Sequence, residues 1–533
     1  MPEHKISPIQ GSPPPKLRFL VIIVLVVGVF FRFVNIDHKV YWFDETFTSL
    51  RISGYTESQV VSQVCNGQEI GVEDLQKYQR LTPEKSLVDT VKSLAIEDSQ
   101  HPPLYYLIVR LWVQKFGSSV AAIRSLSALI SLIAFPCIYW LCLELFESSL
   151  VGLVALTLLA VSPIHVLFAQ EARQYSLWTV TILLSSASLL RAMRLNTTFS
   201  WGIYAISLAL NLYTFLLSGL VAIGHLIYVF ITDHFQLSKR FLNYLLASIA
   251  GILIFTPWLL SVISNSSRFQ ETTNWISKTD VTRWLLIERW FLNFSRIFLD
   301  LGSDFGKPFT YISLIILLGY SVYFLCRRCP KRVWLFVLTL IGSTALTLML
   351  PDIIGKGVRS IVPRYLFPCY LGFNLAVAYL LATQITAVSF RKRRLWQIVM
   401  AVLLSGGVIS CIISSQAKIW WLKGASFKQP VIPQVAGIIN QAAHPLVITS
   451  CEGTWPINDE LYLSHLLASK VRLQLVIPPN MPQTSHSFSD VFLFNLSSET
   501  YRQELLGRFE KEQNYKIKTV YSDNLTLWRL AKQ

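Results

Sequence analysis

The chain has 533 residues, of which 53% are hydrophobic and only 15% are charged, whereas about 25% of the residues of an average soluble protein are charged. Apolar runs of roughly 17 residues or more, long enough to cross a bilayer, recur along it. This excludes a soluble globular protein and predicts a polytopic α-helical membrane protein. Because Lys and Arg gather in the cytoplasmic loops of such proteins, the net charge of +16 does not indicate a nucleic-acid partner.

The N-terminus carries a short polar tail, residues 1–16, which is rich in proline near its end and is expected to be disordered. The apolar run that follows, residues 17–34, lacks a convincing small-residue cleavage site. It is therefore predicted to remain as the first transmembrane helix. Lys16 and Arg18 flank its start, which places the N-terminus in the cytoplasm.

A large non-cytoplasmic loop, residues 35–119, is predicted to come next. It contains Tyr41-Trp42-Phe43-Asp44-Glu45-Thr46, where aromatic side chains that favour the membrane interface precede two adjacent carboxylates. Near the end of the loop, the apolar segment 104–116 is too short to span a bilayer comfortably and contains Arg110. We expect this segment to form a helix that lies in the interface.

Ten further spans are predicted after this loop, which gives eleven in all. Their ranges are 120–143, 149–168, 175–192, 200–216, 218–232, 241–263, 309–326, 333–350, 365–388 and 395–414. Residues 264–307, rich in Trp, Asn and Ser, form a second large outer loop. The membrane part is thus expected to cover residues 17–414.

The positions of the basic clusters support this count. If segment 104–116 does not span, the basic clusters all fall on the cytoplasmic side, as the positive-inside rule requires. These clusters lie at residues 191–194, 239–240, 327–332 and 391–394. The loops that hold Asp44, Glu171 and Arg364 then face the other side of the membrane.

Residues 415–533 have a different character and are predicted to form a small extracytoplasmic α/β domain. Buried strands are expected at 445–449, 471–477 and 491–496, and an amphipathic helix at 498–513. Segments 515–521 and 525–530 are expected to pair as a hairpin. No nucleotide-binding glycine pattern is present.

The eight cysteines are scattered, and most lie in apolar helices, where they act as small hydrophobic residues. Cys326 and Cys329 have the spacing of a redox or metal motif, but no second pair accompanies them, so we interpret them as part of a basic helix end. Cys65 and Cys451 could both face an oxidising compartment, although the sequence alone does not pair them.

The outer loops collect ionisable residues near one membrane surface, where such groups are candidates for function. A carboxylate there could accept a proton from an acceptor hydroxyl, and arginines could hold a phosphate by charge-assisted hydrogen bonds. This combination fits sugar transfer from a lipid-linked phosphate. The residues concerned are Asp44, Glu45, His101, Glu171, Arg173, Arg359 and Arg364.

The order of several motifs resembles glycosyltransferase family 39, which contains the dolichyl-phosphate-mannose protein mannosyltransferases and is related to the aminoarabinose transferases. The resemblance covers roughly residues 15–415. It rests on Asp44-Glu45, His101-Pro102-Pro103-Leu104-Tyr105-Tyr106, Phe116-Gly117, Arg124, Gln170-Glu171-Ala172-Arg173-Gln174-Tyr175 and Pro363-Arg364-Tyr365-Leu366-Phe367-Pro368.

The resemblance implies a GT-C fold, a polyprenyl-phosphate-sugar donor, inversion at the anomeric carbon, and Asp44 as general base with Glu45 beside it. It also extends the expected substrate site to His101, Tyr105, Gln170, Glu171, Arg173, Tyr175, Arg359, Arg364 and Tyr365. The eukaryotic mannosyltransferases carry a β-trefoil domain between membrane helices, which this chain lacks. The acceptor therefore stays open between a lipid, a cell-envelope glycan and a protein.

Each of these residues also has a structural interpretation. His101 before two prolines could cap the interfacial helix, Glu171 and Arg173 could pair with each other, and Arg364 could anchor the chain at the interface. No metal site is predicted, although Glu45, His101 or Glu171 could hold a divalent ion.

The main alternative function is a secondary transporter or lipid flippase. Transporters place ionisable groups near the bilayer midplane and often contain internal repeats, whereas here the acids lie in outer loops. A third alternative, a membrane anchor for the C-terminal domain, leaves eleven spans and the acidic loop without a purpose. We therefore expect a glycosyltransferase of a plasma membrane, with its site on the extracytoplasmic side. The sequence does not identify the sugar.

Overall fold

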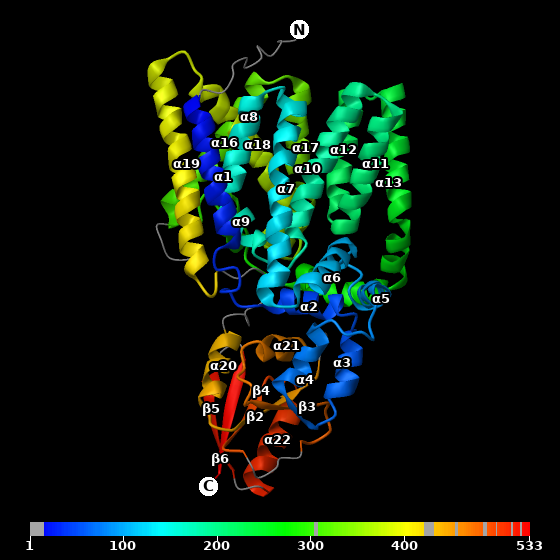
Figure 1. Ribbon diagram of the computed structural model, residues 1–533, viewed down its shortest axis with the longest axis vertical. Helices are drawn as coiled ribbons and strands as arrows, with labels where there is room; N and C mark the ends of the chain where they lie inside the picture. The colour runs from blue at the N-terminus through cyan, green and yellow to red at the C-terminus, as the bar shows by residue number, and fades with distance from the viewer. Residues whose placement is uncertain are drawn as a thin grey trace.

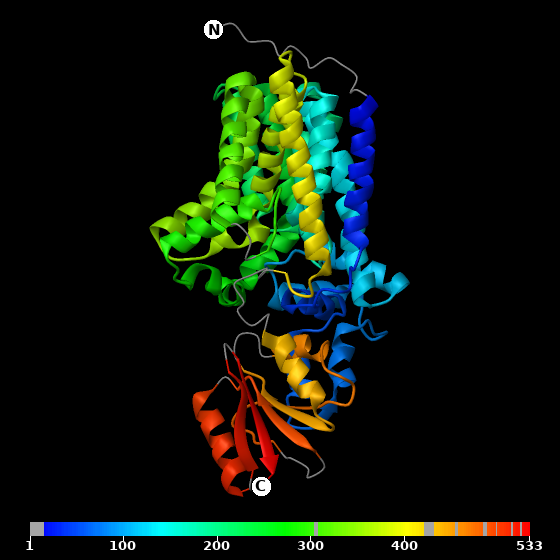
Figure 2. The same ribbon diagram turned by 90° about the vertical axis from the view of Figure 1, so that its left-hand side faces the viewer.

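The computed structural model describes residues 15–302, 307–420, 431–452, 457–482, 488–496, 498–512, 515–522 and 525–532. A bundle of long helices stands on a smaller domain that contains a β-sheet (Figure 1). Shorter helices lie between the two parts, and the view from the side shows the same arrangement (Figure 2). Most of the tail expected at residues 1–16 lies outside the described residues.

The bundle consists of helices whose apolar side chains face both the protein core and the outside. They are α1 (Pro15–Phe33), α7 (Val120–Phe146), α8 (Ser149–Ala160), α10 (Tyr175–Leu195), α11 (Thr198–Thr214), α12 (Ser218–Thr232), α13 (Lys239–Ser264), α16 (Lys307–Arg328), α17 (Lys331–Ile354), α18 (Phe367–Ile385) and α19 (Phe390–Gln416). These bounds agree with the predicted spans to within a few residues at most ends. The helical membrane architecture is therefore confirmed.

Within the described part of the chain, the helices that meet the length and hydropathy of a membrane span are fewer than the eleven predicted. Among the described residues, seven helices are long and apolar enough to cross a membrane, or eight if one bent pair counts as a span. Helices α11 and α12, with 17 and 15 residues, run beside these (Figure 1). Eleven spans therefore stay a prediction.

The bent pair replaces the single helix predicted at 149–168. Helix α8 ends at Ala160, and α9 (Pro163–Ala169) leaves at an angle of 60°. A helix break frees backbone carbonyls, which need partners in a membrane. The guanidinium of Arg32 supplies one, since its Nη1 lies 2.6 Å from the carbonyl oxygen of Ala160.

Both large outer loops contain short helices. The first holds α2 (Phe43–Ile52), α3 (Glu57–Val64), α4 (Val72–Gln76), η1 (Lys77–Gln79), α5 (Leu87–Glu97) and α6 (Leu104–Phe116), and the second holds α14 (Ser266–Lys278) and α15 (Arg283–Ser295). Helix α6 has the predicted bounds and lies at the end of the bundle (Figure 1). Its Arg110 is buried and donates to the carbonyl oxygens of Ile52 and Lys85, so it anchors the loop.

The C-terminal domain contains a six-stranded sheet with the order β1-β3-β2-β4-β6-β5. Strands β2 (Pro445–Ser450), β3 (Arg472–Val476) and β4 (Asp490–Phe494) run parallel, as expected for buried apolar strands. The predicted hairpin is formed by β5 (Tyr515–Ser522) and β6 (Thr526–Lys532). The helices are α20 (Val431–Gln441), α21 (Asn458–Ser464) and α22 (Glu499–Glu512).

The first outer loop contributes to this domain, which the sequence did not predict. Strand β1 (Glu69–Gly71) pairs antiparallel with the edge strand β3. Cys65 and Cys451 form a disulfide, with their Cα atoms 6.3 Å apart. The C-terminal sheet is therefore tied to the loop that carries Asp44.

Candidate active site

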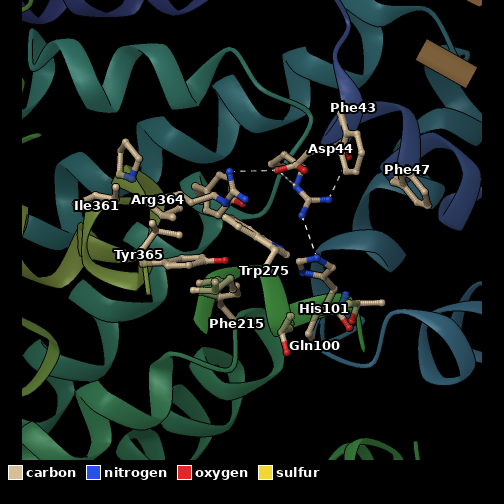
Figure 3. Close-up of a pocket in the computed structure, with 18 of the residues that line it drawn as sticks. Phe43, Asp44, Phe47, Gln100, His101, Phe215, Trp275, Ile361, Arg364 and Tyr365 are labelled. Atoms are coloured by element: carbon tan, nitrogen blue, oxygen red, sulfur yellow. Dashed lines mark hydrogen bonds and ion pairs between the residues drawn. The ribbon is translucent and has the colours of Figure 1, made fainter. Parts of the chain in front are cut away.

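A cavity of about 500 Å³ opens where the helix bundle meets the short outer helices. Its walls come from the start of α2, the loop before α6, the start of α10, helices α14 and α15, and the short helices η2 (Arg359–Ile361) and η3 (Pro363–Leu366). These segments are far apart in the sequence, and Figure 3 shows their side chains converging on one space. The lining combines aromatic rings with several arginines and two carboxylates, Asp44 and Asp98. Asp98 is bound by Arg51 at 2.6 Å, whereas Asp44 faces the other arginines.

Asp44 lies in the first turn of α2, where the helix dipole favours a negative charge. Its Oδ2 lies 3.6 Å from Nη1 of Arg364 and 3.9 Å from Nε of Arg173 (Figure 3). These distances allow attraction but exceed those of hydrogen bonds. Within the described residues, Oδ2 accepts no hydrogen bond, so it can take a proton from a ligand.

Arg173 is held rigidly against α2. Its Nη1 lies 3.1 Å from the carbonyl oxygen of Asp44 and donates to the hydroxyls of Thr48 and Tyr106, at 3.2 and 3.0 Å. Its Nη2 lies 3.2 Å from Nε2 of His101. The guanidinium is 3% exposed, so its charge acts in a low-dielectric environment, where it attracts anions strongly.

His101 is neutral and accepts a hydrogen bond from Arg173. Burial, and then the neighbouring charge of Arg173, lower the pKa of His101 well below its usual range. A neutral imidazole that accepts from Arg173 at Nε2 has its proton at Nδ1. The side-chain nitrogen of Gln174 lies 3.2 Å from Nδ1 of His101, and the side-chain oxygen of Gln174 has no hydrogen-bond partner among the described residues. If the nitrogen and oxygen of this amide exchange places, the oxygen accepts the Nδ1 proton.

Arg364 and two tyrosines form the opposite wall. The guanidinium of Arg364 lies 5.5 Å from the ring centre of Tyr365, a distance typical of a cation–π contact. Tyr175 and Phe215 also line the cavity, and their ring centroids lie 6.1 Å apart in an edge-to-face contact. Phe215 is labelled in Figure 3. Aromatic walls with a few polar groups are typical of ligand sites.

Comparison with known proteins finds a family model that matches part of the chain. The family model of the dolichyl-phosphate-mannose-protein mannosyltransferases matches residues 100–260, a range that includes His101 and Arg173. No curated protein sequence matches the chain.

Solved structures match over nearly the whole chain. The crystal structure of ArnT from Cupriavidus metallidurans bound to undecaprenyl phosphate has a TM-score of 0.54 and 13% identity, covering 96% of this chain and 98% of that one. The apo state of the same protein has a TM-score of 0.56 and 12% identity over the same shares. The archaeal oligosaccharyltransferase AglB from Archaeoglobus fulgidus has a TM-score of 0.50 and 11% identity, covering 97% of this chain and 74% of that one.

The chain is a membrane glycosyltransferase with the GT-C fold.

The structure of this glycosyltransferase separates its two adjacent carboxylates. Glu45 does not line the cavity and is fully buried. Arg124 donates hydrogen bonds to the Glu45 carboxylate from Nε at 2.8 Å and from Nη2 at 2.6 Å. The backbone nitrogen of Ala172 donates to Oε1 of Glu45 at 2.8 Å. These contacts occupy the acceptor positions of the Glu45 carboxylate. Glu45 therefore holds α2 in position.

Other expected site residues also lie outside the cavity lining. Tyr105 is buried with its hydroxyl 2.7 Å from that of Ser127, and Gln170 holds the end of α1 through the carbonyl oxygens of Phe31 and Val34. Glu171, two positions before Arg173, is fully buried. Arg359 pairs with Asp352 at 2.9 Å. The lining thus contains Asp44, His101, Arg173, Tyr175, Arg364 and Tyr365 of the expected set.

The arginines of the second outer loop were not predicted as site residues from the sequence. Leu285, Arg289 and Asn293 line the cavity from one face of α15, and Arg296, the residue that caps its C-terminus, also lines it. Their spacing of three or four residues is that of one helix face, and this periodicity was the available signal. The two arginines, Arg289 and Arg296, make the cavity more strongly positive than the predicted residues alone would.

In the part of the chain that the structure describes, no three His, Cys, Asp or Glu side chains are grouped so that they could hold a metal ion. Glu45, His101 and Glu171, the residues considered for a divalent ion, have different surroundings. Nε2 of His101 is in hydrogen-bond contact with Arg173, and Glu45 forms a salt bridge with Arg124.

Proposed function

We propose that this glycosyltransferase moves a sugar from a polyprenyl-phosphate-linked donor to an acceptor hydroxyl at the extracytoplasmic face of a plasma membrane, with inversion and with Asp44 as general base. The observation that carries the proposal is the position of Asp44. It is a carboxylate that faces arginines across a cavity at the end of the membrane bundle.

The arginines suit the phosphate of the donor. Arg173 and Arg364 flank the cavity on both sides of Asp44, and Arg289 extends the positive wall along α15. Guanidinium groups bind phosphate oxygens through paired hydrogen bonds. One of the similar structures holds undecaprenyl phosphate and another a dolichol-phosphate, which supports a lipid phosphate as the group bound here.

Asp44 acts on the acceptor hydroxyl. The oxygen of an acceptor hydroxyl attacks the anomeric carbon while Oδ2 of Asp44 takes the hydroxyl proton, and the bond between that carbon and the phosphate oxygen breaks. The lipid phosphate leaves with its negative charge, which Arg173 and Arg364 stabilise. A single displacement of this kind inverts the anomeric carbon.

The orientation in the membrane rests on two observations. The basic ends Arg194, Arg240 and Arg332 pair with Glu144, Asp233 and Glu147 at the end of the bundle away from the cavity, as expected of a cytoplasmic side. The disulfide between Cys65 and Cys451 lies on the cavity side, and disulfides persist in oxidising compartments.

The test is sugar transfer by the purified protein in nanodiscs made with lipids of its own membrane. Undecaprenyl phosphates carrying different sugars are supplied, with membrane lipids, envelope glycans and peptides as acceptors in separate reactions. Release of undecaprenyl phosphate that depends on acceptor is expected from the wild type and not from Asp44→Asn. Nuclear magnetic resonance of the product gives the anomeric configuration. If the folded wild type releases no lipid phosphate from any donor, the proposal fails.

A further inference from the structure

The helix that carries Asp44 belongs to the hydrophobic core of the C-terminal domain. Trp42, Phe47 and Leu50, from α2 and the residue before it, form one buried cluster with side chains of α20, α21, β2 and β3. Helix α21 packs directly against α2. The opposite face of the sheet has a separate cluster, built mainly from α22 and the strands. The two faces of this domain therefore differ in their contact with the active site.

The same side chains reach the cavity. Trp42 and Phe47 are members of the C-terminal cluster and also line the cavity. Asp44 lies between them in the sequence, and the rings of Phe43 and Phe47 are 5.5 Å apart along this helix face (Figure 3). A shift of α21 relative to the membrane bundle would thus move the wall that holds the carboxylate.

Further ties join the domain to this segment. The ring of Tyr41 lies 5.0 Å from that of His465 in the domain. The backbone nitrogen of Val40 donates to the carbonyl oxygen of Lys418, which lies just beyond the end of the membrane helix α19, at 3.1 Å. The disulfide between Cys65 and Cys451 and the pairing of β1 with β3 fix the chain beyond α2. The start of the helix is held from the membrane side by the pair of Glu45 and Arg124.

We infer that the C-terminal domain positions Asp44 for the transfer reaction, by holding α2 between α21 and the Glu45–Arg124 pair. The inference rests on the proposed role of Asp44 as base. In this arrangement Leu461 and its neighbours on α21 are positioning residues, since they act on the carboxylate through α2 and do not line the cavity. A reacting group displaced by about 1 Å can lose on the order of 10²-fold in rate, so such support matters.

Two matched substitutions test the inference. Leu461 of α21 is 0% exposed and Leu505 of α22 is 1% exposed, but Leu461 belongs to the cluster shared with α2 and Leu505 to the separate cluster on the other face. Leu461→Ala and Leu505→Ala remove the same atoms from the same domain, so both destabilise that domain by similar amounts. They differ in whether the lost contact supports α2.

The first readout is hydrogen–deuterium exchange of the full-length protein in detergent, without substrate. Exchange of the amides of Phe43–Ile52 should become about tenfold faster or more in Leu461→Ala and stay at the wild-type rate in Leu505→Ala. Equal exchange of this segment in the two variants overturns the inference. Because no substrate is present, this result does not depend on whether sugar transfer is observed.

The second readout is the split between kcat and KM for the undecaprenyl-phosphate sugar that the wild type uses. Leu461→Ala should lower kcat by about 10²-fold with KM for the donor changed by less than about twofold, and Leu505→Ala should leave both near wild type. A fall in kcat of equal size in both variants would show only general destabilisation and overturns the inference. Should Leu461→Ala fail to fold, Cys65→Ser with Cys451→Ser provides a second variant with the same two readouts.

Discussion

The carboxylates of Asp44 and Glu45 are adjacent in the sequence and point into different surroundings. Oδ2 of Asp44 faces the cavity at 3.6 Å from Arg364, whereas both oxygens of Glu45 are bound by Arg124 behind the cavity wall. Neighbouring residues on a helix project about 100° apart, so the start of α2 can present one acid to a ligand and bury the other. This division separates a chemical role from a structural one within two residues.

Glu45→Gln should therefore be a stability variant. The amide keeps the size of the side chain but leaves the buried guanidinium of Arg124 without its counter-charge, and breaking a buried pair in this way costs about 3 to 5 kcal/mol. Thermal unfolding followed by tryptophan fluorescence measures the loss. Glu69→Gln is the control, because its pair with Arg472 is exposed and should contribute less than about 1 kcal/mol. Equal unfolding temperatures for the two variants contradict the structural role of Glu45.

Glu57 should make stability fall as the pH rises. Burial, opposed by the charge of Arg51 and reinforced by Glu97, raises the pKa of Glu57 to about 8. Between pH 5 and 8 the folded state then binds more protons at this site than the unfolded state, so stability from this group is present at low pH and lost as the pH rises. One such proton changes the free energy of unfolding by at most about 1.4 kcal/mol per pH unit.

The measurement is the unfolding temperature of wild type and Glu57→Gln between pH 5 and 9. The variant should show a shallower decline than the wild type, since its side chain does not titrate. Glu97 does not mask the effect, because its pKa is lowered by Arg51 despite burial and it stays ionised throughout this range. Parallel curves for the two proteins contradict the assignment.

The sequence predicted the elements whose pattern is local. Long apolar runs give the bundle helices, the short run 104–116 gives α6, and the segments around residue 523 give the hairpin of β5 and β6. Pairing over large sequence separations left no local signal. The disulfide joins residues 386 positions apart, and β1, with three residues, is too short to be recognised as a strand.

The candidate site was predicted in part for the same reason. Residue type and loop position identified Asp44, Arg173 and Arg364, which line the cavity. They did not separate Arg364 from Arg359, because the two lie five positions apart in one loop, and only the fold shows that Arg359 turns to Asp352. A charged residue in an outer loop can bind a ligand or an internal partner, and the sequence alone does not distinguish these uses.

The orientation can be checked by labelling single introduced cysteines in intact cells with a membrane-impermeant maleimide. Lys516 is an exposed residue of β5 in the C-terminal domain, and Lys392 is exposed at the start of α19 among the basic cluster. We expect Lys516→Cys to be labelled in intact cells and Lys392→Cys only after the membrane is permeabilised. Labelling of both, or the reverse order, contradicts the proposed side of the cavity.

Arg364→Ala should weaken binding of undecaprenyl phosphate by about 10- to 100-fold, because a charge-assisted contact to phosphate is lost. Arg364→Lys should restore part of the affinity, since lysine keeps the charge without the planar fork. Arg359→Ala is the matched control in the same loop, because Arg359 lies outside the cavity lining. Binding is measured by titration in detergent. Equal losses for Arg364→Ala and Arg359→Ala remove Arg364 from the phosphate site.

Asp44→Asn tests the chemistry itself. The amide keeps the shape of the side chain at the start of α2 and removes the proton acceptor, and loss of a general base typically lowers the rate by about 10² to 10⁴-fold. The fold should survive, because Oδ2 makes no hydrogen bond within the described residues and the pair of Glu45 with Arg124 is untouched.

Binding of undecaprenyl phosphate should persist in Asp44→Asn or become tighter, since removing a negative charge leaves Arg173 and Arg364 more attractive to an anion. This combination, a large loss of rate with donor affinity kept, distinguishes a base from a residue that holds the donor. Rate, lipid-phosphate affinity and unfolding temperature are therefore measured on the same preparation. A folded Asp44→Asn protein that transfers sugar at nearly the wild-type rate rules Asp44 out as the base, and one that is slow only because it no longer binds the lipid phosphate assigns Asp44 to donor binding instead.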